Sequence, residues 1–249
     1  MAGLFSKLRF AATPKPLEPA SIMVGAGKIG VMFKRHAQAR RMVLRLNAEG
    51  TAVVVTVPGH ANRTQAIDFT ERSRDWIEQK LAAHGGSIAM TPGNRIPLRG
   101  SEHEIVHVPS RRGTVTIDPL AGVIRVPGEV PHVPRRLLDW LKTTARAELT
   151  SASRKYAALM GVKFSRVTIR DQRSRWGSCS AAGELSYSWR LILTPPHVLD
   201  YVAAHEAAHL KHMNHGRHFW RLVLTHCPDA AKAKKWLKAN GQSVHRIAV

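Results

Sequence analysis

The sequence predicts an α+β protein with two parts: a small β-rich N-terminal module with one helix over residues 22–130, and a second domain over residues 131–249. Two observations support this class. In the first part, short β-rich runs are separated by Gly, Pro and Ser, as is typical of small β modules. In the second part, a long helical pattern is followed by short strand patterns and a nearly all-apolar helix. We therefore expect a short sheet packed against this last helix.

The N-terminal module is expected to follow a mobile basic tail, residues 1–21, which lacks the apolar core of a signal peptide. Residues 42–46 and 53–57 are two β-rich runs around a loop that contains Gly50, a pattern typical of a hairpin. Residues 25–30, Gly-Ala-Gly-Lys-Ile-Gly, match a dinucleotide-binding fingerprint. We reject that interpretation because no βαβ pattern surrounds the glycines.

A helix is expected to begin at Asn62 or Thr64, since either side chain can cap it, and to end at Gly85 and Gly86. Three short strands are expected after this helix, at residues 104–108, 114–117 and 123–126. Pro131 then indicates the boundary between the module and the second domain. No internal repeat is apparent in either part.

In the second domain, apolar residues recur at intervals of three and four over residues 135–160, which predicts a long helix that ends at Gly161. A strand is expected at residues 162–170, and another at 185–193, directly before the apolar helix. Two further helices are expected, at residues 218–224 and 230–237. If the strand at 185–193 forms an edge of the sheet, it could bind an extended peptide by strand addition.

The composition is that of an ordinary globular chain, with 249 residues of which 44% are hydrophobic. No apolar run approaches the roughly 18 residues of a transmembrane helix, so no membrane association is expected. The two cysteines, Cys179 and Cys227, are too few for a disulfide framework. They favour a reducing compartment, and we expect a cytoplasmic protein.

The formal net charge is +21, from 38 Lys and Arg against 17 Asp and Glu. Such a field attracts polyanions, including nucleic acid. The basic residues are scattered, however, and no aromatic residues are interleaved with them as they are in base-stacking surfaces. We therefore expect nonspecific nucleic-acid association rather than sequence recognition.

Residues 205–209 read His-Glu-Ala-Ala-His, which is the strongest chemical signal in the sequence. Residues four apart share a helix face, so His205 and His209 can bind one metal ion, and Glu206 can reach a metal-bound water. The alternative is a His-rich helix on a basic surface. Because residues 198–208 are apolar nearly all round, the helix is instead expected to be buried. Buried imidazoles and a buried carboxylate need partners, and a metal ion supplies them.

A third ligand has to come from a segment that folds back after the motif. His212 lies on the same helix face, but a straight helix spreads His205, His209 and His212 over ~10 Å, too far for one ion. No Glu follows Glu206 in the sequence, which excludes a downstream glutamate ligand. The remaining donors are His215, His218, His226, His245 and Asp229.

His215 has the spacing of the third histidine in extended motifs of this kind, with Asn214 or Gly216 available to form the turn. His218 is the reserve candidate. Three protein ligands leave the fourth position to water, which is the open arrangement of catalytic zinc. The residues thus predict a zinc-dependent hydrolase.

Several further motifs accompany these histidines. They are residues 173–179 (Arg-Ser-Arg-Trp-Gly-Ser-Cys), 189–191 (Trp-Arg-Leu), 201–202 (Tyr-Val), 219–220 (Phe-Trp), and, upstream, residues 40–41, 44–45 and 75–77. With them the sequence resembles the YgjP-like family of zinc metallopeptidases, which is related to SprT-like and Wss1-like proteases. The resemblance spans about residues 25–240. It implies a zincin-like fold with a short sheet beside the active-site helix, Zn²⁺ on His205, His209 and His215, and a catalytic Glu206.

A site of this kind predicts hydrolysis of a protein or peptide substrate, in which Glu206 takes a proton from the zinc-bound water and delivers it to the leaving amine. The oxyanion that forms needs a second electrophile, for which Tyr187, Arg190 and His218 are candidates. Two alternatives stay open. One is a protease that clears proteins from nucleic acid, and the other is a non-catalytic zinc protein in which Cys179 closes the coordination shell.

Overall fold

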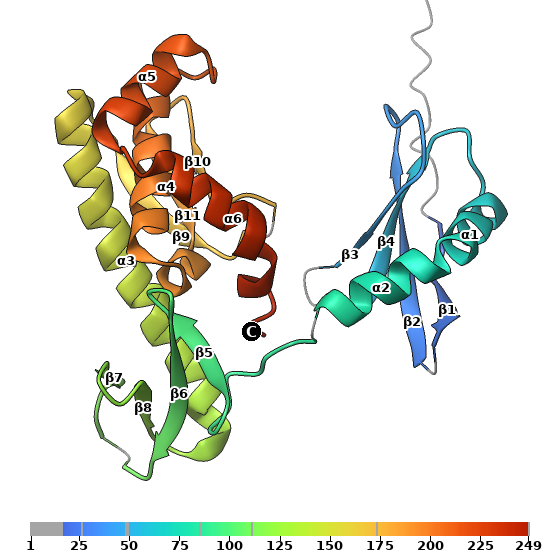
Figure 1. The fold of residues 1–249 in the computed structure, drawn as a ribbon, viewed down its shortest axis with the longest axis horizontal. Helices are drawn as coiled ribbons and strands as arrows, with labels where there is room; N and C mark the ends of the chain where they lie inside the picture. The colour runs from blue at the N-terminus through green and yellow to red at the C-terminus, as the bar shows by residue number, and fades with distance from the viewer. Residues whose placement is uncertain are drawn as a thin grey trace, which may run out of the picture. The chain divides into compact units, whose positions relative to one another are not determined.

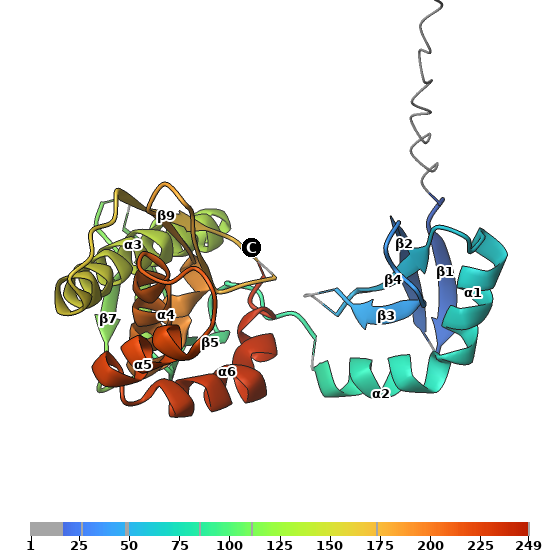
Figure 2. The ribbon, with the colours of Figure 1, turned by 90° about the horizontal axis from the view of Figure 1, so that it is seen from above.

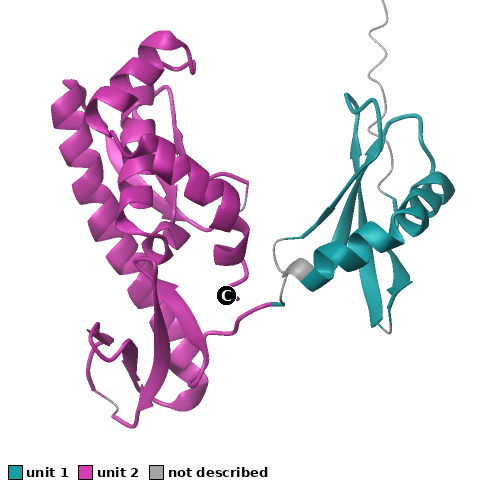
Figure 3. Cartoon of the chain, in the orientation of Figure 1, with its two compact units in different colours: residues 1–86 teal, residues 87–249 magenta. Residues whose placement is uncertain are grey.

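A computed structural model describes residues 17–25, 27–47, 50–84, 86–110, 112–172 and 174–248 of the chain. The chain divides into two compact units, Met1–Gly86 and Ser87–Val249 (Figure 3). Each unit has its own buried apolar cluster. None of the helices in the described ranges is long and apolar enough to cross a membrane.

The first unit is a four-stranded sheet covered on one face by two helices (Figure 1). The strands lie in the order β1-β2-β4-β3, with β2 and β4 parallel and the two outer pairs antiparallel. Their bounds are β1 Ala20–Val24, β2 Gly27–His36, β3 Val43–Leu46 and β4 Ala52–Pro58, and the helices are α1 Arg63–Arg72 and α2 Arg74–His84. Side chains alternate along β4, so that Val53, Val55 and Val57 are buried under the helices.

The predicted hairpin at residues 42–57 is confirmed as β3 and β4. Asn62 caps α1 as expected, through a reciprocal capping box with Gln65. The expected single helix is instead interrupted at Ser73, which separates α1 from α2. The glycines of the rejected dinucleotide fingerprint lie in the β1–β2 hairpin, where Gly25 takes a left-handed φ of 56°. No strand-to-helix turn stands there.

The expected tail over residues 1–21 also ends earlier than its predicted boundary. Ala20 and Ser21 already belong to β1, since they pair with Val31 and Gly30 of β2. The rest of that expectation, residues 1–16, lies outside the described part of the chain.

The second unit begins with another four-stranded sheet, in the order β5-β6-β8-β7. Its strands are β5 Arg95–Leu98, β6 Ser101–Val108, β7 Thr116–Asp118 and β8 Val123–Pro127. A short 3-10 helix, η1 Val130–His132, leads into the long helix α3, Val133–Met160. As predicted, α3 ends at Gly161, which adopts the left-handed conformation with φ 66°. Its buried stripe includes Leu137, Leu141 and Leu149, which face the core.

After α3 the chain forms a three-stranded sheet and three more helices. The strands are β9 Arg166–Arg170, β10 Gly177–Cys179 and β11 Glu184–Ser188, in the order β10-β11-β9. The remaining elements are the 3-10 helix η2 Trp189–Leu193, and the helices α4 Pro196–His209, α5 Arg217–His226 and α6 Ala230–Val244. Helix α4 packs along α3 on one side and against α5 and α6 on others, so it is the central element of the unit (Figures 1 and 2).

The strand expected over residues 185–193 is only half a strand, because residues 189–193 form η2. Strand β11 also lies between β10 and β9, so it is not the free edge that strand addition requires. The short β10 is one of the two edges of this sheet.

The division after Gly86 differs from the expected boundary at residue 130. Strands β5–β8 share a core with the helical half of the unit, since Ile105 and Leu137 belong to one buried cluster. The turn between β5 and β6 is also hydrogen-bonded to η2: the amide of Arg99 donates to the carbonyl of Ile192 at 2.9 Å. The prolines near residue 130 therefore mark the start of η1 and α3 rather than a linker.

The two four-stranded sheets have the same topology, although no repeat is apparent from the sequence. Each places two antiparallel hairpins side by side, with the second strand of each hairpin forming the central parallel pair. Strands β4 and β8 both end at Pro in a Val-Pro-Gly sequence, and helices follow both sheets. The structure thus contains an internal repeat of strand order.

Candidate metal centre

Helix α4 carries the His-Glu-Ala-Ala-His motif in the interior of the second unit. Pro196 stands in its first turn, where a missing amide hydrogen costs nothing. Alanines at 203, 204, 207 and 208 are buried, and their small side chains let α4 lie close to its neighbours. The helix ends at His209, so the two motif histidines occupy its last two turns.

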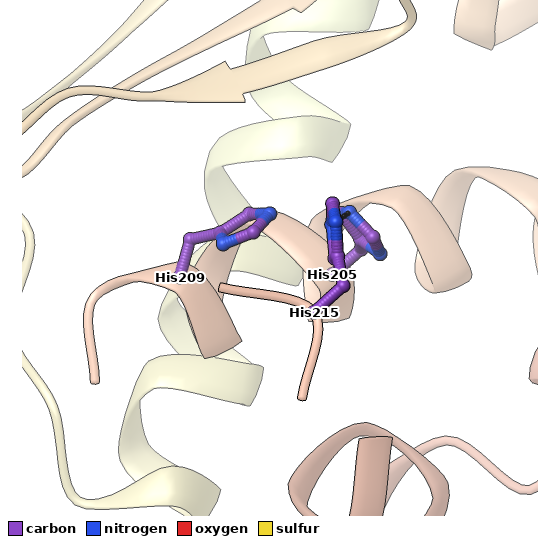
Figure 4. Close-up of side chains that lie close together, drawn as sticks. All are labelled: His205, His209 and His215. Carbon is purple, nitrogen blue, oxygen red and sulfur yellow. Dashed lines mark hydrogen bonds between the residues drawn. The ribbon is translucent and has the colours of Figure 1, made fainter. Parts of the chain in front are cut away.

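His205, His209 and His215 lie together, as Figure 4 shows. Each offers one ligand atom, and these three atoms lie within 4.8 Å of one another. The Nε2 atoms of His205 and His215 are 3.0 Å apart, and the three ring centroids are separated by 4.7 to 4.9 Å. Two imidazole nitrogens at this distance require a shared proton or a shared cation between them.

His215 reaches the other two rings because the chain reverses after α4. The segment after Leu210 turns back, and α5 starts at Arg217 with Gly216 as its N-cap residue. The amide of Gly216 donates to the carbonyl of Asn214 at 2.8 Å, which tightens this turn around His215. His215 therefore comes from the segment that the spacing predicts.

Two aromatic residues of α5 support the histidines. Phe219 is fully buried, and its ring centroid lies 4.6 to 4.9 Å from all three imidazoles. Trp220 stacks on His215 with an interplanar angle of 24° and a centroid distance of 5.8 Å. Lys234 of α6 lies over Trp220, with Nζ 4.3 Å from the ring centroid.

Contacts to the Nδ1 atoms of His205 and His209 indicate how these two rings are oriented. Nδ1 of His209 lies 3.2 Å from the carbonyl oxygen of His212, an acceptor, so Nδ1–H donates and Nε2 is left with a lone pair. The hydroxyl of Tyr201 lies 3.5 Å from Nδ1 of His205. Burial, together with the neighbouring His209 and His215, lowers the pKa of His205 to about 3, so this imidazole is neutral.

The donor set fits a zinc ion. Three imidazoles whose ligand atoms converge match the ligand type that zinc prefers, and three ligands leave a position open. Among the described residues no other His, Cys, Asp or Glu joins this group. In particular Cys179 is not a member, and its Sγ lies 3.5 Å from the carbonyl oxygen of Ser180.

Glu206 is the buried carboxylic acid of the site, with 5% of its surface exposed. Burial raises the pKa of Glu206 to about 8, and the positive charge of Arg175 opposes the rise. The side chain packs on the backbone of Gly177 in β10, where a Cβ atom would lie 2.6 Å from Oε1. With His205, it faces a pocket of about 230 Å³.

The three residues expected as candidates for oxyanion binding do not line the pocket beside Glu206. Tyr187 is buried in the core, and its hydroxyl lies 3.0 Å from Oγ of Ser153 on α3. Arg190 is 2% exposed and donates from Nε to Oδ1 of Asp171 at 2.9 Å. His218 is exposed, and its ring lies beside that of His212, at a centroid distance of 6.0 Å. It does not belong to the triad of His205, His209 and His215.

None of these three residues lines the pocket beside Glu206. The residues that do line it are Arg175, Trp176, Gly177, Tyr201, Val202, His205, Glu206 and Leu237. Leu237, from α6, had no signal in the sequence beyond its place in a helical pattern. The sequence marks Gly177 only as a glycine inside a motif. Its role, which is to leave space for the Glu206 side chain, is visible only in the structure.

Comparison with known proteins shows the family of the chain. Residues 40–240, most of the chain, match the family described as YgjP-like, metallopeptidase domain. Among solved structures, the metallopeptidase zymogen of Pyrococcus abyssi abylysin is similar at 22% identity, with a TM-score of 0.35 over 41% of this chain and 99% of that chain. No curated protein matches the chain. On the extent of the family match, the chain belongs to the YgjP-like family of metallopeptidase domains.

Proposed function

We propose that this protein is a zinc-dependent peptidase in which His205, His209 and His215 hold the metal and Glu206 is the general base. The observation that carries the proposal is the convergence of three imidazole nitrogens within 4.8 Å, directly beside a buried carboxylic acid. A zinc ion held by these three residues would supply a Lewis acid, which would polarise a peptide carbonyl and lower the pKa of a bound water. The substrate is a protein or peptide, as the metallopeptidase family indicates.

Glu206 moves the proton in this mechanism. Burial raises the pKa of Glu206, so its carboxylate is a stronger base than a carboxylate in water and holds the proton of the attacking water more firmly. The proton passes from the attacking water to a Glu206 oxygen, and from there to the amine nitrogen that leaves. Gly177 leaves room for the carboxyl group in this position, since a Cβ atom at residue 177 would lie 2.6 Å from Oε1 of Glu206.

The main test is Glu206→Gln, which preserves shape but removes the base. We expect peptide hydrolysis to fall by roughly 10²- to 10⁴-fold while one zinc ion per chain is retained, as measured by elemental analysis. A chelator should abolish hydrolysis by the unaltered protein, and added Zn²⁺ should restore it. His218→Gln is the matched control, because His218 is exposed and lies outside the triad. Unchanged turnover in Glu206→Gln would overturn the proposal.

We further propose a reducing, cytoplasmic environment, which the two free cysteines support. The net charge of +21 supports weak, nonspecific association with nucleic acid. If that association serves a protease acting on nucleic-acid-bound proteins, added DNA should accelerate hydrolysis, and the acceleration should decline as salt is raised. If added DNA does not change the rate of hydrolysis, a peptidase that acts independently of nucleic acid is favoured.

A further inference from the structure

The pocket beside Glu206 has apolar walls and one acidic group. Trp176, Tyr201, Val202 and Leu237 supply the walls, while Glu206 is the only carboxylate among its lining residues. At about 230 Å³ it is smaller than the roughly 300–1,000 Å³ of typical small-molecule sites. Its size therefore suits a single amino-acid side chain rather than a cofactor.

The wall formed by Trp176 is held by packing against α6 and the residue that follows it. The Trp176 ring lies against that of His245, tilted by 33° at a centroid distance of 4.9 Å, and it packs so closely on α6 that a Cβ at Gly241 would lie 3.2 Å from its ring. Helix α6 itself packs against α4. A pocket with such walls is preformed, and it can select by shape.

Two cations flank this site from different elements. Arg175 lines the pocket from the loop before β10. Lys234 is three residues before Leu237 on α6, so the two share a helix face, and its Nζ lies over Trp220, which stacks on His215. Both Arg175 and Lys234 are exposed.

Within the described part of the chain, neither Arg175 nor Lys234 forms an ion pair with a carboxylate, although the charge of Arg175 acts on Glu206. Three carboxylates of this unit are paired with other cations. These pairs are Asp171 with Arg190, Glu184 with Arg166, and Asp200 with Lys155. The rim of the site therefore carries free positive charge.

Resting on the proposed peptidase activity, we infer that the substrate is a polypeptide with a bulky apolar residue next to the cleaved bond and acidic residues flanking it. The apolar side chain fills the pocket formed by Trp176, Tyr201 and Leu237, where burial removes it from water. The acidic residues face Arg175 and Lys234. Complementary charge at an exposed rim increases association more than it stabilises the complex.

The test uses the full-length zinc protein and a mixture of peptides from a digested proteome, with cleavage sites read by mass spectrometry. We expect Leu, Phe or Met at one position adjoining the cleaved bond, and Asp or Glu enriched within the next positions. Sites without an apolar preference would overturn the inference while leaving the peptidase proposal intact. If the mixture is cut no faster by the unaltered protein than by Glu206→Gln, the peptidase proposal itself fails.

Leu237→Trp tests the pocket directly, because a larger side chain fills it. We expect kcat/KM for a peptide with Phe at the selected position to fall at least tenfold relative to its Ala analogue, as a single methylene group in an apolar pocket changes selectivity by about 10- to 200-fold. Leu224→Trp, on the exposed surface of α5, is the matched control. Equal loss for both peptides, or no loss, contradicts the assignment of the pocket.

Arg175→Glu and Lys234→Glu test the rim. Each should reverse the preference between otherwise identical peptides with flanking Glu or Lys, and the effect should shrink in high salt. Lys232→Glu is the control, because it makes the same change in net charge at an exposed position two residues from Lys234. Binding of labelled peptides to Glu206→Gln, followed by fluorescence anisotropy, separates affinity from turnover. A preference that stays the same in both rim variants overturns the acidic part of the inference.

Discussion

At the scale of single residues, the contact between Glu206 and Gly177 constrains the site most. A Cβ atom at position 177 would lie 2.6 Å from Oε1 and 2.7 Å from Cγ of Glu206. Real Cβ atoms essentially never approach another heavy atom this closely. Gly177 is not among the glycines with left-handed backbone, so space and not conformation requires it. The sequence motif around residue 177 thus belongs to the arrangement in which Glu206 is the proposed general base.

Gly177→Ala should therefore displace the Glu206 carboxyl without touching the three imidazoles. We expect hydrolysis to fall on the order of 10²-fold, the effect of misplacing a catalytic group by about 1 Å, with zinc content unchanged. Gly59→Ala is the control, because a Cβ atom at position 59 would meet nothing within 4 Å and the backbone there needs no glycine. Full activity in Gly177→Ala would show that the close contact does not position the base.

Cys179 decides between an open and a closed metal site. Burial raises the pKa of the Cys179 thiol, and the charge of Glu206 raises it further, so the thiol stays protonated at neutral pH. A zinc ion deprotonates any thiol that it binds, so what speaks against Cys179 is its position: the ligand atoms that converge are those of His205, His209 and His215. Cys179→Ala should keep one zinc per chain and its hydrolysis. X-ray absorption of the unaltered protein should show no sulfur at ~2.3 Å, and a sulfur there would favour the non-catalytic alternative.

At the scale of elements, local sequence patterns predicted those helices and strands whose periodicity is unambiguous. Helix α3 has a regular apolar stripe and a glycine stop, and β3 and β4 alternate around a loop. Residues 189–193 differ, because all five are buried and a continuous apolar run has no period that separates a strand from a helix. The three histidines came together as expected: spacing placed His205 and His209 on one helix face, and His215 was favoured among the donors that remained after elimination.

Arg190 shows why a charged residue beside a motif can be misread as catalytic. Its guanidinium donates to Asp171, and its Nη1 donates to the carbonyls of Val244 at 3.1 Å and Ile247 at 2.8 Å. It also lies over the Trp189 ring, 4.7 Å from the centroid. These contacts join η2 to the end of α6, and only the tertiary structure shows them.

Arg190→Met should consequently destabilise the second unit rather than impair catalysis directly. Loss of a buried cation leaves two carbonyls and a carboxylate unpaired, and we expect about 3 kcal/mol less free energy of unfolding. Urea unfolding followed by tryptophan fluorescence measures this change. Asp171→Asn should cost less, because the Asp171 side chain is partly exposed. A large loss of kcat at full stability would restore Arg190 as an oxyanion-binding candidate.

At the scale of the whole molecule, one strand order is used twice. Val-Pro-Gly closes β4 at residues 57–59 and β8 at residues 126–128, and Asp-Trp recurs in the following helices at residues 75–76 and 139–140. These short matches have unequal spacing, so no fixed period announces them. The first copy is covered by α1 and α2, whereas the second shares its core with α3 and α4. Because the second copy shares its core with the helices that follow it, the chain does not divide at residue 130, where the sequence suggested a boundary.

The position of the boundary predicts how fragments behave. A fragment of residues 87–249 contains an entire buried cluster, so it should fold, bind one zinc ion and retain hydrolysis. A fragment of residues 131–249 lacks β5–β8, which exposes the apolar side of α3 that includes Val133 and Leu137, and it should aggregate. Circular dichroism, thermal unfolding and zinc analysis of both fragments test this expectation. Cooperative unfolding and zinc binding by residues 131–249 would instead return the boundary to residue 130, and would mean that the second sheet is dispensable for the metal centre.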